Sequence, residues 1–249
     1  MKHFFALLCV VAYFGHAEAD DRNRYQESVQ DFLGLLERDT SPPKGGSSSV
    51  NQANEFMDVV LLQRMPTLIR ETAGLFPAAP LPPYHFKVYK TSITNRDLKV
   101  NVTRGGLKNF DTAVLRVGDC IPALVAGNTS VSCTLSFDGI LAELVTVTKG
   151  DNLLGIVKSV DVEAHVYNTT GRLEVTAAPN RPGFVRTLFV ESVNFDVRPG
   201  ENLDLNEVRM SNFKLNIANF LREELYMNIY GNYQTLLNHA VARMNFVLS

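Results

Sequence analysis

The sequence has 249 residues, with 24 basic and 26 acidic side chains and a formal charge of −2. This near-neutral balance provides no long-range attraction to nucleic acid or to an anionic membrane surface. Hydrophobic residues make up 45% and charged residues 20% of the chain, which is the composition of an ordinary globular protein.

Residues 1–19 have the three parts of a secretory signal peptide. Met1-Lys2-His3 is a basic start, residues 4–14 are apolar, and Ala17-Glu18-Ala19 ends the segment with small residues at the cleavage positions. The apolar run is too short for a membrane span, which takes about 20 residues. We therefore expect cleavage after Ala19 and a secreted, extracellular protein.

Residues 20–82 are predicted to be an N-terminal helical region. Tyr25, Val29, Phe32 and Leu36 recur at helical spacing. Residues 39–49, which are rich in Pro, Gly and Ser, then have the composition of a flexible linker. A second helix follows, with Pro66 expected to kink it because proline lacks a backbone N–H and clashes with the preceding turn.

From residue 84 to about residue 216, apolar residues recur with a period of two. In one stretch Val160, Val162 and Ala164 alternate with polar residues, which indicates strands with one buried face. Turn signals such as Arg104-Gly-Gly divide the region into hairpin-connected strands. Changes of phase within a run, as over residues 208–215, predict β-bulges and hence a strongly curved sheet.

Residues 217–244 have helical periodicity again and would form a helix about 40 Å long. A curved sheet is the available cover for an apolar stripe of that length. The predicted fold is α+β: a long, strongly curved antiparallel sheet rolled around a long C-terminal helix, with N-terminal helices. Residues 83–249 would form this rolled domain.

Two cysteines, Cys120 and Cys133, remain after signal cleavage and flank a stretch with turn residues. In an oxidising compartment this pattern predicts a disulfide across a hairpin, and the absence of Cys-x-x-Cys spacing argues against a redox motif. Three Asn-x-Ser/Thr sequons, at Asn101, Asn128 and Asn168, predict glycosylation.

The sequence offers no motif for catalysis or metal binding. His85, His165 and His239 form no ligand pair, and neither a His-Glu-x-x-His motif nor a Gly-x-Ser-x-Gly elbow is present. We therefore expect a protein that is not an enzyme and that uses no cofactor and no metal.

The segments Gly106-Leu107-Lys108 and Arg116-Val117-Gly118-Asp119 resemble a stretch of the group 7 mite allergens. The order of elements over residues 95–246 is similar too. That family belongs to the tubular lipid-binding superfamily, with the bactericidal permeability-increasing, takeout and juvenile-hormone-binding proteins. The resemblance implies a curved sheet around a long helix, an apolar tunnel, an elongated apolar ligand, and no catalytic residues.

The leading prediction is a secreted carrier that binds a lipid, fatty acid or terpenoid in an apolar groove between the sheet and the C-terminal helix. The alternative for each lining residue is that it simply fills a solid core. A second function is an extracellular interaction or defence protein that recognises microbial surface lipid or a partner protein. Transient contact with a membrane or microbial surface fits either function, nucleic acid does not, and the ligand and oligomeric state stay open. The predicted lining residues are Leu221, Leu225, Ile229, Tyr233 and Leu236 on the helix, with Val193, Phe195 and Val197 on the sheet.

Overall fold

The computed structural model describes residues 46–92, 96–150 and 155–244, and the described residues from 47 onward form one compact unit. The predicted signal peptide, the predicted helix of residues 20–38 and linker residues 39–45 lie outside the described residues. Residues 46–49, which the sequence pattern assigned to the linker, are in the first turn of a helix.

The described chain begins with three helical segments in succession: α2 (Gly46–Val59), the π-helical turn η1 (Val60–Arg64) and α3 (Met65–Arg70). The predicted disturbance by Pro66 takes the form of η1, which directly precedes α3, because proline has no N–H to continue regular α-helical hydrogen bonding. One face of this run, which includes Met57, Val60 and Ile69, is completely buried.

The described strands pair in two sheets, and every pairing is antiparallel. The larger sheet has the order β1-β3-β6-β7-β10, with β2 also paired to β3, and the smaller sheet has the order β4-β5-β8-β9. The strands of the larger sheet are β1 (Ala79–Pro80), β2 (Tyr84–Val88), β3 (Leu98–Lys108), β6 (Leu141–Lys149), β7 (Val157–Tyr167) and β10 (Asn194–Pro199). Those of the smaller sheet are β4 (Leu115–Val125), β5 (Asn128–Ser136), β8 (Thr170–Ala177) and β9 (Phe184–Val190).

The Arg104-Gly-Gly segment lies within strand β3, so the predicted turn at this position is wrong. The register of the β3–β6 pairing shifts between Val102 and Arg104, which marks an irregularity in this ladder. A Cβ atom on Gly105 would lie 2.8 Å from the carbonyl oxygen of Glu143 and 2.5 Å from a methyl of Leu144. The glycine is therefore needed for close approach to β6 and not for a turn.

The C-terminal helix has three parts: α4 (Glu207–Asn228), the π-helical turn η2 (Ile229–Tyr233) and α5 (Gln234–Ala242). It begins about ten residues earlier than predicted, and the predicted bulged strand over residues 208–215 is wrong. Asn206 caps the helix, since its side-chain oxygen accepts a hydrogen bond from the N–H of Arg209 at 3.0 Å. Val208 and Leu215, which had supported the alternation, are exposed.

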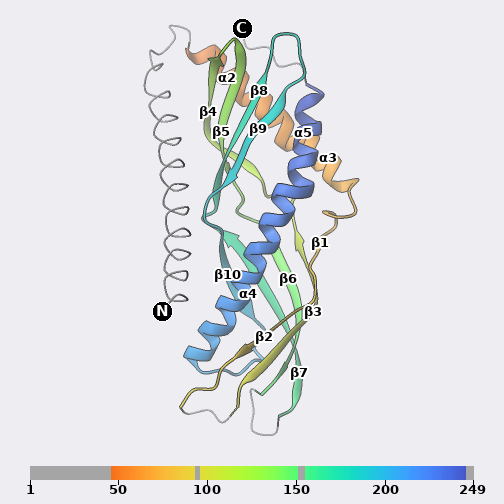
Figure 1. The fold of residues 1–249 in the computed structure, drawn as a ribbon, viewed down its shortest axis with the longest axis vertical. Helices are drawn as coiled ribbons and strands as arrows, with labels where there is room; N and C mark the ends of the chain where they lie inside the picture. The colour runs from red at the N-terminus through yellow and green to blue at the C-terminus, as the bar shows by residue number, and fades with distance from the viewer. Residues whose placement is uncertain (1–45, 93–95, 151–154, 245–249) are drawn as a thin grey trace, which may run out of the picture. The chain divides into compact units, whose positions relative to one another are not determined.

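The two sheets follow one another along the C-terminal helix (Figure 1). The helix part α4 contacts β2 and β10, which are edge strands of the larger sheet, whereas α5 contacts β9 of the smaller sheet and α3. One hydrophobic core includes residues of both sheets and all three helix parts. The predicted α+β class with a long C-terminal helix is confirmed, and the curved sheet is divided into two. None of the described helices is both long and apolar enough to span a membrane.

Candidate functional site

Helix α4 packs against the larger sheet at two of its edge strands, β2 and β10. We call these two contact lines the β2 seam and the β10 seam. Aromatic rings close the β2 seam. The ring of Tyr84 stacks on that of Phe220, with centroids 4.4 Å apart and an interplanar angle of 1°. Phe86 lies 5.7 Å from Phe213 one level further along the helix. These contacts join half-buried rings of the strand to buried rings of the helix, and such aromatic pairs contribute beyond their buried area.

The seam toward β10 is held at one end by side chains of α4 and η2. Arg222 donates to the carbonyl of Val193 at 3.0 Å, and the hydroxyl of Tyr226 donates to the carbonyl of Glu191 at 2.9 Å. The N–H of the last residue of β9 donates to the hydroxyl of Tyr230 at 3.0 Å. The connection between β9 and β10 is therefore fixed to the helix.

Beyond these hydrogen bonds, the seam between β10 and α4 opens into a groove of about 540 Å³. This volume lies in the range of small-molecule sites, about 300–1,000 Å³, and the groove is open to solvent. Most of its surface is apolar, and strands β7 and β10 and the first half of α4 supply its residues. We call it the β10–α4 groove; it is lined by His165, Tyr167, Phe195, Asp196, Val197, Arg198, Lys214, Leu215 and Ala218.

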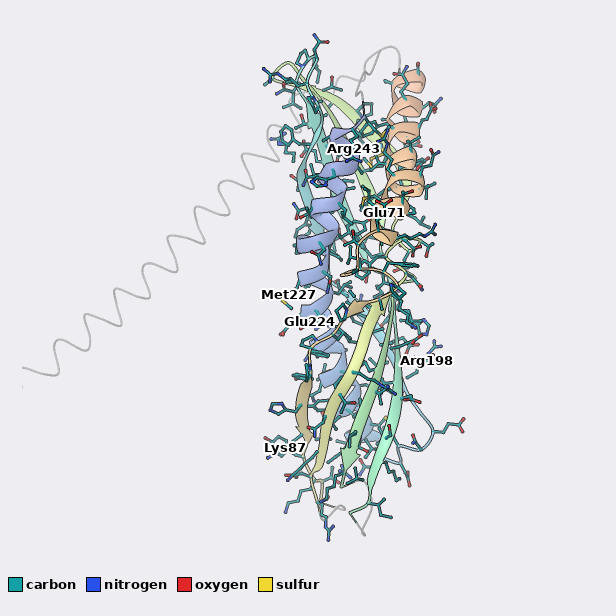
Figure 2. The ribbon with its side chains drawn as sticks, turned by 90° about the vertical axis from the view of Figure 1, so that its right-hand side faces the viewer. Glu71, Lys87, Arg198, Glu224, Met227 and Arg243 are labelled. Atoms are coloured by element: carbon teal, nitrogen blue, oxygen red, sulfur yellow. A yellow bond between two sulfur atoms is a disulfide. The ribbon has the colours of Figure 1, made fainter. Side chains whose placement is uncertain are left out.

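Charged groups stand at the rim of the β10–α4 groove. Arg198, on the larger sheet (Figure 2), is paired with Asp196 at 2.6 Å, so these two charges offset one another. His165 lies 3.9 Å from Glu163. Within the described residues, Lys214 makes no ion pair, and its half-buried side chain supplies a cation beside an apolar surface.

The structure brings two predicted lining residues, Phe195 and Val197, into the groove. The helix residues Leu221, Leu225 and Ile229 are completely buried away from it, as the solid-core alternative expects. Of the remaining predicted residues, Val193 and Tyr233 are also buried and Leu236 is half-buried. Burial raises the pKa of the Tyr233 hydroxyl well above its ordinary value.

The sequence pattern did not indicate the other seven groove residues, of which Tyr167, Leu215 and Ala218 supply apolar surface. Leu215 was assigned to a strand, and its position in α4, one turn before Ala218, was therefore not considered. An N-cap signal at Asn206 followed by Glu207 was present and would have moved the start of the helix.

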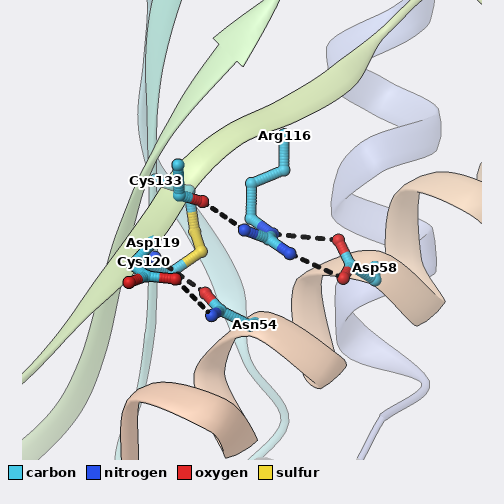
Figure 3. Close-up of a disulfide and its surroundings, with 7 residues drawn as sticks. Asn54, Asp58, Arg116, Asp119, Cys120 and Cys133 are labelled. Carbon is cyan, nitrogen blue, oxygen red and sulfur yellow. Dashed lines mark hydrogen bonds and ion pairs between the residues drawn. A yellow bond between two sulfur atoms is a disulfide. The ribbon is translucent and has the colours of Figure 1, made fainter.

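Figure 3 shows a second structured site, around the disulfide of the smaller sheet. Cys120 and Cys133 are joined as predicted, across the β4–β5 hairpin. The β4–β5 register shifts between Val117 and Ile121, and the extra residues of β4 bulge there. Asn54 of α2 accepts from the N–H of Cys120 at 2.8 Å, so the helix holds the bulge in place.

The predicted glycosylation sites and histidines occupy different environments. Asn101 on β3 and Asn168 at the β7–β8 turn are exposed, and Asn128 at the start of β5 is half-buried. His85 and His239 are exposed. Among the described residues, no group of three His, Cys, Asp or Glu side chains is arranged to hold a metal.

The fold and groove define a class of α+β protein in which antiparallel sheets follow a long helix and leave one seam open. No family model matches the sequence. The chain is 41% identical over 201 residues to the salivary anticoagulant protein P23 of Ixodes scapularis, a match that covers 80% of this chain and 90% of that protein. It therefore belongs to the family of salivary anticoagulant protein P23.

Two solved structures are similar to this chain at low identity. Lipopolysaccharide binding protein matches with a TM-score of 0.45 and 12% identity. The match covers 77% of this chain and 40% of lipopolysaccharide binding protein. Takeout 1 of Epiphyas postvittana matches with a TM-score of 0.37 and 14% identity over 76% of this chain and 91% of its own.

Proposed function

We propose that the protein is a secreted, non-enzymatic carrier that binds an elongated hydrophobic ligand in the β10–α4 groove. The observation that carries the proposal is the difference between the two seams of the larger sheet. Aromatic rings close the seam at β2, whereas the seam at β10 leaves an apolar groove with exposed Tyr167 and Leu215.

The size of the hydrophobic effect supports this assignment. Removing a methylene group from water contributes about 0.8 kcal/mol, so a ten-carbon chain would gain about 8 kcal/mol before the cost of association. Covering the exposed side chains of Leu215 and Tyr167 with such a chain also removes their apolar surface from water. A fatty acid, another lipid or a terpenoid meets this requirement.

Secretion gives such a carrier a use, because insoluble ligands need a protein to cross an aqueous fluid. The predicted signal peptide and the Cys120–Cys133 disulfide support an extracellular location. A relative described as salivary agrees with it. The resemblance to group 7 mite allergens stays a prediction that points to the same kind of ligand.

The carrier proposal is tested on protein secreted by eukaryotic cells. Native mass spectrometry, followed by organic extraction, should show an apolar ligand bound with defined stoichiometry. The delipidated protein should then take up a fluorescent fatty acid. Absence of an extracted ligand together with absence of uptake would contradict the proposal.

A second function, inhibition of blood coagulation, is favoured by one observation: the 41% identical relative is described as an anticoagulant. This function corresponds to an interaction protein that recognises a partner and has no need to transport a ligand. Added to plasma, the protein should prolong clotting time and delay thrombin generation in proportion to its concentration.

The two functions are separated by delipidation. If the protein acts as an anticoagulant through a partner alone, the delipidated and lipid-loaded forms should prolong clotting equally. If lipid uptake is the activity, clotting time should stay unchanged while fluorescent fatty acid still binds. Unchanged clotting at micromolar protein would exclude the second function.

A further inference from the structure

The residues of the β10–α4 groove fall into an order along its length, because α4 runs antiparallel to β10. Residues 200–206 connect the end of β10 directly to the start of α4. Further along the helix, the Nε of Arg222 donates to the carbonyl oxygen of Val193, the residue before β10, at 3.0 Å. The start of α4 therefore lies beside the end of β10, and Arg222 lies beside its beginning.

Lys214 lies level with the second half of β10. About 12 Å of helix separates it from Arg222, at about 1.5 Å per residue. On the strand, Asp196 lies about 10 Å and Arg198 about 16 Å beyond Val193, at about 3.3 Å per residue. Both walls of the groove consist of described residues. Lys214 is thus opposite the ion pair of Asp196 and Arg198.

The other end of the groove is apolar. By the same measure, Ala218 of the helix is level with Phe195 of the strand, each about 6–7 Å from the hydrogen bond that joins helix and strand. Tyr167 of β7 pairs in register with the first residue of β10 and completes this end. The groove therefore has an apolar end at Tyr167, Phe195 and Ala218 and a charged end at Lys214.

Lys214 supplies the uncompensated charge at the charged end. Asp196 and Arg198 offset each other through contacts of 2.6 and 2.8 Å, and Glu163, in register with Arg198, does not line the groove. Among the described residues, no carboxylate pairs with Lys214. Ion pairs within a helix form three or four positions apart, and no acidic residue stands at these positions from Lys214. The residues there are Met210, Ser211, Ile217 and Ala218.

A half-buried cation at one end of an apolar groove fits an amphiphile with a negative headgroup. The lysine ammonium group is a point charge with three donors, which anionic oxygens accept. Because Lys214 is half-buried, water screens its charge less than that of a fully exposed lysine. An uncharged headgroup would gain less at this position, and a positive one would be repelled.

We propose that the β10–α4 groove binds a single-chain lipid with an anionic headgroup, such as the carboxylate of a fatty acid. The headgroup lies at Lys214, and the hydrocarbon chain extends toward Tyr167, Phe195 and Ala218. This inference rests on the carrier function proposed above. It adds the charge of the ligand and the direction in which the ligand lies.

The test measures headgroup preference on the delipidated full-length protein, with three ligands that share a 12-carbon chain. Lauric acid, dodecanol and dodecylamine compete, below their micelle concentrations, with the uncharged fluorescent probe N-phenyl-1-naphthylamine. At pH 8 the acid is ionised and the amine is protonated. Wild-type protein should bind lauric acid about 5-fold more tightly than dodecanol, as expected for a partly buried ion pair, and dodecylamine most weakly. Acetate, which has the headgroup without the chain, should not compete at millimolar concentration.

Four variants place the preference on named side chains. Lys214→Met should abolish the preference for acid over alcohol and leave the affinity for dodecanol unchanged. Lys214→Glu should reverse the charge preference, so that dodecylamine binds more tightly than lauric acid. Lys87→Met, at an exposed lysine on β2 outside the groove (Figure 2), is the matched control and should keep the wild-type preference. Tyr167→Ala should weaken all three ligands about 3-fold without changing their ratios, since it removes apolar contact alone.

Each failure has a separate meaning. If none of the three ligands displaces the probe, the carrier function itself fails. If wild-type protein binds dodecanol or dodecylamine as tightly as lauric acid, the carrier function stands and the anionic headgroup is contradicted. If Lys214→Met keeps the wild-type preference, the headgroup does not lie at Lys214. A changed ratio in Tyr167→Ala would contradict the direction of the ligand, and competition by acetate would show a site for free carboxylate and overturn the lipid assignment.

Discussion

The guanidinium of Arg116 on β4 and the carboxylate of Asp58 on α2 form a two-point ion pair, with Nε–Oδ1 and Nη2–Oδ2 distances of 2.9 and 2.7 Å (Figure 3). Arg116 also donates to the carbonyl oxygen of Gly118. The Arg116-Val-Gly-Asp segment, on which the resemblance to mite allergens partly rests, thus joins the bulged strand to the helix.

Arg116→Ala should lower the free energy of unfolding by about 1–2 kcal/mol, because paired, charge-assisted hydrogen bonds are among the stronger ones. Urea denaturation of Arg116→Ala, Asp58→Ala and the double variant measures the coupling between the two side chains. Removal of the exposed pair between Arg198 and Asp196 is the control and should cost at most about 0.5 kcal/mol. Equal losses at both pairs would contradict the docking role.

Gly105→Ala should destabilise the protein by about 1–3 kcal/mol, since the added methyl would meet the backbone oxygen of Glu143, which cannot move freely. Gly231→Ala is the matched control in the π-helical turn of the C-terminal helix. No atom lies within 4 Å of the methyl it would add, so a gain of about 0.5–1 kcal/mol is expected there. Thermal and urea denaturation check both signs.

Burial raises the pKa of Glu224 on α4, and the neighbouring carboxylate of Glu223 adds to the effect. A carboxyl group with a higher pKa in the folded state makes its ionised form costly to fold. The cost is absent below the ordinary pKa of 4.5 and complete above the raised value. Glu224→Gln should therefore increase stability at pH 7, and the increase should vanish as the pH falls toward 4.

Unfolding midpoints of Glu224→Gln and of the exposed neighbour variant Glu223→Gln, measured between pH 4 and pH 8, test this pH dependence. The control should show a smaller gain at neutral pH, through relief of repulsion alone. If the difference in unfolding midpoint between Glu224→Gln and wild type stayed constant from pH 4 to pH 8, burial would not affect the ionisation of Glu224.

The exposure of the sequons gives a further prediction. Asn168 at the β7–β8 turn has a φ of 47° and is exposed, so a glycan there would extend into solvent. We expect treatment of the secreted protein with an amidase that removes N-glycans to reduce its mass, and Asn168→Gln to remove part of that reduction. An unchanged mass on treatment would contradict glycosylation at all three sequons.

Local patterns in the sequence predicted much of the fold. The alternation of Val160, Val162 and Ala164 identified β7, and two cysteines around turn residues identified the disulfide. The long C-terminal helix was also expected from its apolar spacing. Each of these features is encoded within a short stretch of chain, where periodicity decides which face is buried.

The groove and the division of the sheet could not be predicted in this way. The β10–α4 groove combines residues of β7, β10 and α4, which are far apart in the sequence and come together only in the folded chain. The start of α4 was misjudged because Val208, Met210, Phe213 and Leu215 fit two alternating runs as well as a helix. Capping by Asn206 decides that ambiguity.

The central claim, that the β10–α4 groove binds a hydrophobic ligand, is tested most directly by two matched substitutions. Leu215 in the groove is 55% exposed and Leu62 on the π-helical turn η1 is 54% exposed, so an aspartate at either position should cost little stability. Affinity for a fluorescent fatty acid should fall about 10-fold or more in Leu215→Asp, through lost apolar contact, and stay at the wild-type value in Leu62→Asp. Equal affinity of wild type and both variants would contradict the account.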